Sequence, residues 1–314
     1  MSDRIDKFLT GSEFERWTQF RLTGDASSRN YTRLIGPLGQ SAVMMDTPPD
    51  QAESLTAFLR IGAHLAQIGL SPPQTLLADT GSGLLVIEDL GLHHFAEWLM
   101  GHPTDETLLY TAATDVLARV QRHPPPDGLT ALTPAHAARM ISPLTEWYAP
   151  NAPLELLVTA LEQALLHHAP VADRLSLRDF HAENLIWRAA KTGAGQVGLL
   201  DFQDAVLAPP EYDLASLLRD ARRDVSQQLC DTMILRFADL SGHDPVKTRA
   251  AFVCLSVQRN LRILGIFAGL ARRDGKLRYL DLMPRVWGHI QRDLVHPALS
   301  ELAPLIAAHI QAPA

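Results

Sequence analysis

The sequence predicts an α+β protein with two lobes, the first built on an antiparallel sheet and the second mostly helical. Short strand-like runs separated by turn residues fill the N-terminal part of the chain, whereas helical periodicity dominates from Phe95 onward. With 314 residues, 46% of them hydrophobic, the chain can bury a core large enough for two lobes. We place the first lobe at residues 1–91 and the second at residues 92–314.

The first lobe is predicted to hold a sheet and a single helix. A polar break at residues 23–30 makes the first two strands a hairpin with a long tip, and Pro48 with Pro49 ends the third strand. The helix is predicted to start after Asp50 as N-cap and to stop at Gly69. The predicted strands cover residues 14–22, 31–35, 41–46, 74–79 and 83–90, and the helix covers residues 52–68.

The second lobe is predicted to be helical around one short strand-like island at residues 184–202. A Pro-rich segment at residues 122–134 is typical of an extended loop. The predicted helices cover residues 95–100, 106–122, 134–148, 154–167, 214–239, 245–270 and 284–299.

Composition narrows the classes of function. The net charge of -7 and the absence of a Lys/Arg run argue against a nucleic-acid-binding surface, so a small-molecule substrate is expected. Cys230 and Cys254 are too few and too far apart for a disulfide framework or a Cys-rich zinc site. No apolar run approaches the roughly 20 residues of a membrane span, and the N-terminus lacks a signal-peptide pattern. We therefore expect a cytoplasmic protein without a membrane partner.

The glycines of the island match a dinucleotide-binding fingerprint only formally. Gly193, Gly195 and Gly198 have the G-x-G-x-x-G spacing, but the fingerprint must follow a strand and open a helix. Here the glycines lead into the apolar run at residues 197–200. We interpret them as the tip of a hairpin.

The strongest chemical signal lies at the two ends of the island. Asp179 and Asn184 have the D-x-x-x-x-N spacing that ends a kinase catalytic loop, and Asp201-Phe202-Gln203 follows after one hairpin, where kinases carry D-F-G. One carboxylate can deprotonate an attacking hydroxyl, while an amide and a second carboxylate hold Mg²⁺ on the phosphates. Taken alone, D-x-x-x-x-N also fits a solvated loop before a strand, with Asn184 capping a turn. The second aspartate at a strand end favours catalysis.

Over nearly the whole chain the sequence resembles the aminoglycoside phosphotransferase/choline kinase-like family, which has a two-lobed protein-kinase-like fold. It is most similar to the bacterial branch of anomeric kinases that act on N-acetylmuramate and N-acetylglucosamine in cell-wall recycling. The resemblance implies ATP and Mg²⁺ as cofactors, Asp179 as catalytic base, and Asn184 and Asp201 as magnesium ligands. The stretches that carry it are residues 24–34, 43–49, 178–184, 199–225 and 258–270.

Two positions depart from the family pattern. Leu177 stands where the family loop usually starts with His, and the strand at residues 41–46 lacks the lysine that contacts the α/β-phosphates. We hypothesise that Arg29 or Arg33 replaces this lysine, because guanidinium groups fit phosphate oxygens; the alternative is an exposed strand face.

Three further groups of residues are candidates for binding. Ser27 and Ser28 at the hairpin tip can offer donors to phosphate, although a plain turn needs no such role. Residues 86–91 should form the hinge, where adenine would bond backbone groups around Glu88, Asp89 and Leu90. For the acceptor, the candidates are Asp204, Gln258 and Arg262. Gln258 and Arg262 share a helix face within a stretch that resembles the sugar-kinase branch.

Asp213 begins an apolar helical segment, so N-capping is its plain interpretation. The resemblance implies in addition that it braces the catalytic loop.

The sequence thus predicts a kinase that phosphorylates a hydroxyl of a small molecule, preferably the anomeric position of an N-acetylated amino sugar. Two alternatives stay open at this point. One is a kinase for another acceptor, such as an aminoglycoside, choline or homoserine. The other is a non-catalytic, nucleotide-binding pseudokinase, which the missing lysine and histidine would favour and the retained Asp179, Asn184 and Asp201 disfavour.

Overall fold

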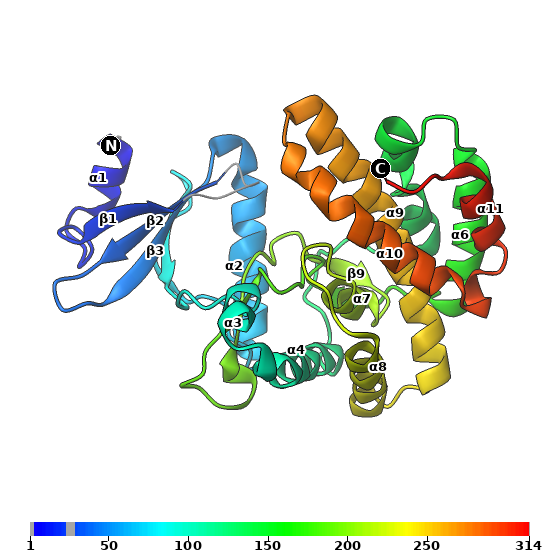
Figure 1. Ribbon diagram of the computed structural model, residues 1–314. Coiled ribbons are helices and arrows are strands. Elements are labelled where there is room, and N and C mark those ends of the chain that lie inside the picture. The colour runs from blue at the N-terminus through cyan, green and yellow to red at the C-terminus, as the bar shows by residue number, and fades with distance from the viewer. Residues whose placement is uncertain (1–2, 23–28, 314) are drawn as a thin grey trace. The chain divides into compact units, whose positions relative to one another are not determined.

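The computed structural model describes residues 3–22 and 29–313, and contacts within it divide the chain into two compact units (Figure 1). The first unit comprises residues 1–94 and 185–204, and the second comprises residues 95–184 and 205–314. The chain therefore passes between the units on both sides of the strand-like island. The island itself belongs to the first unit.

The first unit is built on a five-stranded antiparallel sheet with the strand order β1-β2-β3-β5-β4. The predicted strands and the helix after the third strand are present, and the tip at residues 23–28 lies outside the described residues. Its elements are α1 (Asp3–Leu9), β1 (Thr18–Leu22), β2 (Asn30–Ile35), β3 (Ser41–Asp46), a 3₁₀ turn η1 (Pro49–Gln51), α2 (Ala52–Gln67), β4 (Thr75–Asp79) and β5 (Leu84–Glu88).

Apolar residues on one side of this sheet pack against the segment that contains α1. Leu9 and Phe14 join Leu34, Met44 and Val86 in one buried cluster, which the sequence analysis did not foresee as a helix contact. Burial of these side chains removes apolar surface from water and holds the N-terminal segment on the sheet.

The start of α2 differs from the prediction, whereas its end agrees with it. Asp50 is not the N-cap, because Pro49 already starts a 3₁₀ turn there, and Gln51 precedes the helix without a side-chain capping bond. Gly69 adopts a φ of +74° just after the last turn, as expected of a helix stop.

The island is the predicted hairpin. β7 (Leu185–Trp187) pairs antiparallel with β8 (Val197–Leu199), and a 3₁₀ turn η4 (Gly193–Gln196) joins them. A Cβ at Gly198 would lie 2.9 Å from the Leu90 side chain, so this glycine allows close packing rather than phosphate binding. The hairpin is fixed to the first unit by hydrogen bonds from Trp187 to the carbonyl of His93 (2.7 Å) and from Leu199 to that of Ser71 (3.0 Å).

The second unit is a helical bundle around the long helix α9, which packs against α6, α7, α8 and α10 (Figure 1). Its α-helices are α3 (Phe95–Gly101), α4 (Glu106–Gln121), α5 (Pro134–Arg139), α6 (Leu154–His168), α7 (Tyr212–Leu218), α8 (Gln227–Ser241), α9 (Pro245–Asp274), α10 (Met283–Leu294) and α11 (Leu302–His309). Shorter elements are η2 (Pro103–Asp105), the π-helical turn η3 (Leu144–Tyr148), η5 (Leu277–Leu282), η6 (Pro297–Leu299) and the antiparallel pair β6 (Arg174–Ser176) and β9 (Val206–Ala208).

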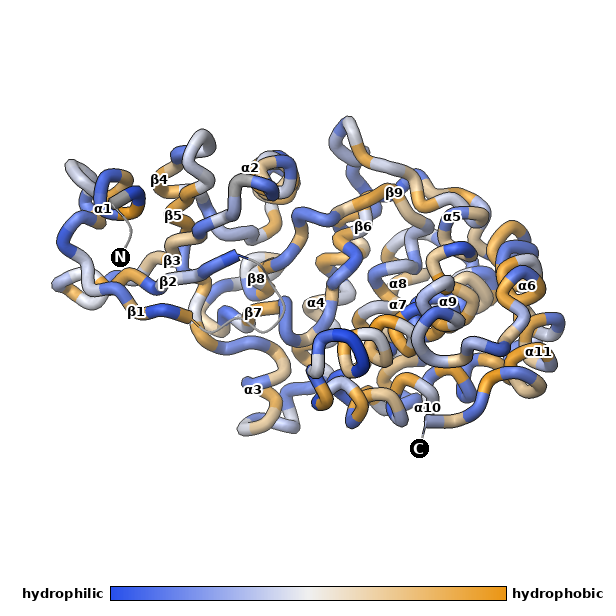
Figure 2. Tube along the Cα trace, turned by 90° about the horizontal axis from the view of Figure 1, so that it is seen from above, coloured by the Kyte–Doolittle hydropathy of each residue, from blue (hydrophilic) through white to orange (hydrophobic). Residues whose placement is uncertain are grey.

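Hydrophobic and hydrophilic residues are mixed along α6, as Figure 2 shows, and the apolar side of this helix is buried. By length and composition α9 would suit a membrane span, but 78% of its most apolar window is buried in the structure, as in a helix of a protein core.

Three predicted helices are interrupted. The segment at residues 134–148 is α5 followed by η3, and the segment at residues 214–239 breaks after Leu218. The segment at residues 284–299 is α10 followed by η6. The second break has a tertiary cause, because the Arg219 guanidinium turns inward to form an ion pair with Asp293 (2.7 Å) in which both side chains are almost fully buried. Ser226 then caps α8 through its hydroxyl.

Candidate active site

The segment between β6 and β7 is a loop braced by a buried carboxylate. Asp213, on α7, accepts hydrogen bonds from the Ser176 hydroxyl (2.7 Å) and from the backbone N–H groups of Leu177 (2.6 Å) and Arg178 (2.9 Å). Burial raises the pKa of Asp213, while the three donors and the nearby Arg259 oppose that rise. Asp213 lies inside α7 rather than at its N-cap, so the capping interpretation was wrong. The structure instead shows that Asp213 braces the loop between β6 and β7.

Arg178 holds a left-handed backbone conformation with a φ of 69°. Such a conformation costs a non-glycine residue about 1–2 kcal/mol, so neighbouring groups must hold it in place. The carbonyl of Arg178 accepts hydrogen bonds from the Arg259 guanidinium (3.0 Å) and from the Ser216 hydroxyl (3.2 Å). Arg259 also lies over the Tyr212 ring, 4.8 Å from its centroid. These contacts fix the backbone immediately before Asp179.

Asp179 follows this strained residue, and its side chain is exposed. Within residues 3–22 and 29–313 no hydrogen bond or ion pair engages its carboxylate. An exposed carboxylate on a rigid loop is available to accept a proton from a bound hydroxyl.

Asn184 is oriented by two contacts of its amide nitrogen. This nitrogen donates to the backbone carbonyl of Asp179 (2.9 Å) and lies 3.3 Å from Nε2 of His181. Burial lowers the pKa of His181, which favours the neutral ring that can accept this hydrogen bond. With the nitrogen engaged in this way, the amide oxygen is the atom suited to a hard cation.

A second buried carboxylate, that of Asp220, supports the same loop. Asp220, which is 2% exposed, accepts hydrogen bonds from the backbone N–H groups of Ala182 (3.3 Å) and Arg222 (2.8 Å). Arg222 in turn pairs with Glu183 at 2.8 Å. These two polar residues, which were not predicted to support the loop, thus hold the loop that carries Asp179.

Asp201 lies in the first unit, directly after the island hairpin, and it too has a left-handed backbone, with a φ of 57°. The next residue anchors it, because the fully buried Phe202 ring stacks on Phe58 of α2 with centroids 4.9 Å apart. The Gln203 amide donates to the Asp201 carboxylate at 2.6 Å. Asp201 and Asp204 are both exposed.

The predicted hinge, residues 86–91, begins within β5 and is fixed by two ion pairs within the first unit. Glu88 pairs with Arg188 (2.8 Å), and Asp89 pairs with Arg33 (2.7 Å). Within the described part of the chain, the backbone groups of Leu90 take part in no hydrogen bond. Such backbone groups can form hydrogen bonds with the edge of a nucleotide base.

The two candidate arginines occupy different surroundings. Arg33 lies opposite Val43 of β3 and is engaged by Asp89. Arg29 is 6% exposed, and its guanidinium donates to the Ser54 hydroxyl in the first turn of α2. Ser27 and Ser28 lie outside the described residues.

The two acceptor candidates on α9 differ in burial and in their contacts. Gln258 is fully buried and its amide donates to the carbonyl of Ala137 (2.8 Å), so it ties α9 to α5 and its position gives no support to a substrate contact. Arg262 is only partly buried, and its guanidinium lies near enough to Arg178, Arg259 and Asp179 for their charges to affect its pKa.

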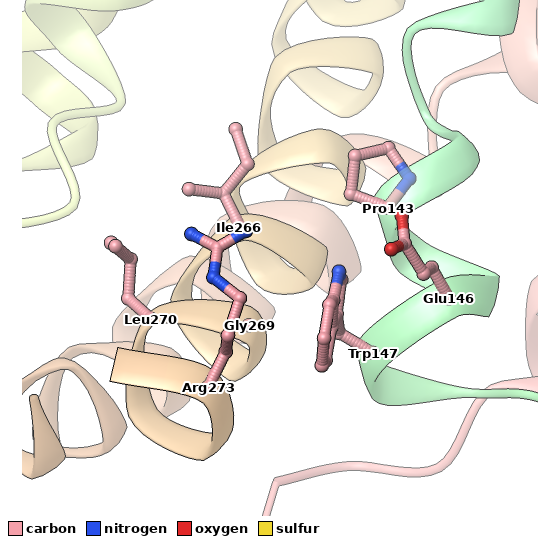
Figure 3. Close-up of a pocket in the computed structure, with 7 residues that line it drawn as sticks. All are labelled: Pro143, Glu146, Trp147, Ile266, Gly269, Leu270 and Arg273. Atoms are coloured by element: carbon pink, nitrogen blue, oxygen red, sulfur yellow. The ribbon is translucent and has the colours of Figure 1, made fainter. Parts of the chain in front are cut away.

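An open pocket of about 220 Å³ lies farther along α9 (Figure 3). The Trp147 ring of η3 forms one wall, and Arg273 lies 5.8 Å from its centroid. Gly265 allows η3 to approach α9, because a Cβ there would lie 2.2 Å from the backbone of Pro143. The lining residues are Pro143, Glu146, Trp147, Ile266, Gly269, Leu270 and Arg273.

Comparison with known proteins identifies the family of this chain. The model of the phosphotransferase enzyme family matches residues 19–253. The chain belongs to this phosphotransferase family. Two curated relatives are similar along most of their length. The N-acetylmuramate/N-acetylglucosamine kinase of Caulobacter vibrioides is 37% identical, covering 94% of this chain and 93% of that protein. The kinase of the same name from Pseudomonas putida is 32% identical, covering 91% and 86%.

Solved structures confirm the predicted α+β, protein-kinase-like fold of this phosphotransferase. The choline kinase LicA from Streptococcus pneumoniae matches with a TM-score of 0.63 and 16% identity, covering 96% of this chain and 98% of that one. The GDP complex of wild-type aminoglycoside 2'-phosphotransferase-IIIa matches with a TM-score of 0.61 and 15% identity, covering 93% and 96%. At these identities the likeness concerns the fold alone.

The structure of this phosphotransferase shows what holds the loop at the position where the expected histidine is absent. Leu177, at the position where a histidine was expected, is 2% exposed, and its backbone N–H donates to Asp213. Packing and the Asp213 carboxylate therefore hold the start of the loop.

Proposed function

We propose that this phosphotransferase transfers the γ-phosphate of ATP to the anomeric hydroxyl of N-acetylglucosamine or N-acetylmuramate, as part of cell-wall sugar recycling in the cytoplasm. The observation that carries the proposal is the braced loop that presents Asp179, in a chain whose curated relatives bear the name of that kinase. The hydroxyl oxygen attacks the γ-phosphorus, the bond to the β-phosphate oxygen breaks, and ADP leaves.

Asp179 is the proposed base. It orients the sugar hydroxyl and receives its proton, which the rigid backbone of Arg178 and the exposure of the carboxylate both favour.

Asn184 and Asp201 are the proposed Mg²⁺ ligands. An amide oxygen and a carboxylate are the hard donors that this cation prefers, and each is set by local contacts, from His181 to Asn184 and from Gln203 to Asp201. When bound, the cation neutralises phosphate charge. The two residues belong to different units, and the hairpin that separates them in sequence begins at Leu185 and ends at Leu199. We propose that both residues are ligands of the Mg²⁺ of Mg-ATP, and that Asp204 contributes to acceptor binding.

The nucleotide is proposed to bind at residues 86–91, the predicted hinge. The backbone of Leu90, which follows two residues fixed by ion pairs, suits the adenine edge. Arg29 supplies the positive charge that strand β3 lacks, and Arg33 fixes the hinge through its ion pair with Asp89. Ser27 and Ser28 remain proposed phosphate donors.

The test compares wild type with Asp179→Asn, which keeps the size of the side chain but removes its basicity. ADP release is measured with N-acetylglucosamine, N-acetylmuramate, choline, homoserine and an aminoglycoside, and Mg-ATP binding is measured by calorimetry. We expect turnover with the two amino sugars and a loss of about 10²–10⁴-fold in the variant, with nucleotide affinity nearly unchanged.

Asp173→Asn is the matched control, because Asp173 is an exposed carboxylate of the same unit. Turnover of Asp179→Asn within threefold of this control would overturn the base assignment. ADP release with another acceptor alone would overturn the choice of substrate, and ATP binding without transfer to any acceptor would point to a pseudokinase.

A further inference from the structure

Arg262 belongs to a group of basic residues at the loop that carries Asp179, because Arg178, Arg259 and Asp179 lie near enough for their charges to affect its pKa. Other carboxylates of this region have partners of their own. Asp213 accepts three hydrogen bonds from the loop, Asp220 accepts two from backbone N–H groups, and Glu183 pairs with Arg222.

Arg262 is the arginine of this group without an assigned task. Arg259, one turn earlier on α9, is engaged by the carbonyl of Arg178 and by Ser216. Across residues 3–22 and 29–313, by contrast, no hydrogen bond or ion pair holds the Arg262 guanidinium. Other arginines of the unit have carboxylate partners: Arg219 with Asp293, Arg222 with Glu183, Arg223 with Glu106, Arg236 with Asp115 and Arg249 with Asp231.

An arginine that is partly buried without a partner is energetically unfavourable, since a desolvated charge is normally paired. Burial lowers the pKa of Arg262, and the neighbouring charges of Arg178 and Arg259 act in the same direction. A bound anion would remove both penalties. A carboxylate fits best, because the planar guanidinium can bind both of its oxygens.

The position of Arg262 favours the acceptor over the nucleotide as the source of that anion. Arg262, Ile266, Gly269 and Arg273 recur at spacings of four, three and four residues and therefore share one face of α9. This face leads from the neighbourhood of Asp179 to the Trp147 pocket (Figure 3), all within the second unit. The residues proposed for the nucleotide base lie in the first unit.

We infer that Arg262 binds the carboxylate of the lactyl group when the acceptor is N-acetylmuramate, and that it thereby determines the preference for the acidic over the neutral amino sugar. This inference rests on the proposed function. N-acetylglucosamine lacks the lactyl group, so the same enzyme would turn it over without using this contact.

The test measures kcat and KM of wild type, Arg262→Met and Arg262→Lys for both sugars at saturating ATP. Methionine keeps the apolar length of the side chain without its charge. For Arg262→Met we expect kcat/KM for N-acetylmuramate to fall about 10- to 100-fold, the range of a hydrogen bond to a charged group, mainly through KM. The values for N-acetylglucosamine should stay within about threefold, and Arg262→Lys should retain part of the discrimination. Arg272→Met, at an exposed position of the same helix, is the control.

A second measurement needs no variant. Wild type should discriminate by a similar factor against N-acetylmuramate whose carboxylate has been converted to the primary amide. Equal losses for both sugars, a parallel rise in the KM for ATP, or acceptance of the amide as readily as the acid would each overturn the role of Arg262. Wild-type turnover of N-acetylglucosamine reports separately on the proposed function, and its absence together with that of N-acetylmuramate would overturn both.

Discussion

The brace under the catalytic loop gives a prediction whose size follows from its contacts. In Asp213→Asn one carboxylate oxygen becomes an amide nitrogen, and each oxygen currently accepts from the loop, Oδ2 from Leu177 and Oδ1 from Arg178 and Ser176. An NH₂ group at either position faces a donor, so at least one hydrogen bond to a charged group is lost, at about 1.5–3 kcal/mol. The left-handed backbone of Arg178 loses support as well.

We expect Asp213→Asn to lower the melting temperature by several degrees, since about 1 kcal/mol corresponds to roughly 2–4 °C in a domain of this size. Because the loop carries Asp179, kcat should fall more than KM for ATP rises. Thermal unfolding and steady-state kinetics measure the two effects, with the exposed Asp173→Asn as a control for the same chemical change. A variant that matches this control in both melting temperature and kcat would refute the reasoning.

Two further predictions concern a buried acid and the metal ligand. Burial raises the pKa of Glu211 to about 7 from 4.5, so it favours folding below pH 4.5, and this contribution is lost as the pH rises to 7. Glu211→Gln should therefore be more stable than wild type at pH 8 by up to roughly 3 kcal/mol and gain little at pH 4.5, as denaturant unfolding at both pH values would show; an equal effect at both would contradict it. His181→Ala removes the contact between Nε2 of His181 and the amide nitrogen of Asn184. The Mg²⁺ concentration for half-maximal turnover should rise about 10-fold, and an unchanged Mg²⁺ dependence would exclude a positioning role for His181.

Local patterns predicted the first unit well because its elements are defined by local features. β3 covers the predicted residues, since an alternating run ends at prolines that cannot continue the ladder. Helix α1 could not be predicted in this way. It is a short helix. Its apolar residues Ile5, Phe8 and Leu9 are buried by the sheet against which they pack, and the local sequence does not show that contact.

In the second unit, the misses arise from contacts between residues far apart in sequence. No glycine or proline marks the break after Leu218, which follows from the ion pair of Arg219 with Asp293. The same holds for the candidate site. The spacing of Asp179 and Asn184 was visible in the sequence, whereas the roles of Asp220 and Arg259 in holding the loop depend on helices that follow it. Spacing within one loop predicts chemistry, but it does not reveal which distant side chains make that loop rigid.

The contacts of the two candidate arginines indicate how the absent β3 lysine is replaced. Releasing Arg33 would leave Asp89, whose side chain is 6% exposed, as a buried carboxylate without its partner, at a cost of several kcal/mol. Arg29 donates to the hydroxyl of Ser54 in the first turn of α2, and its planar guanidinium fits phosphate oxygens. Since Arg29 also directly follows the segment with Ser27 and Ser28, we expect the two tasks to be divided. Arg33 positions the hinge, and Arg29 supplies the charge that other kinases obtain from lysine.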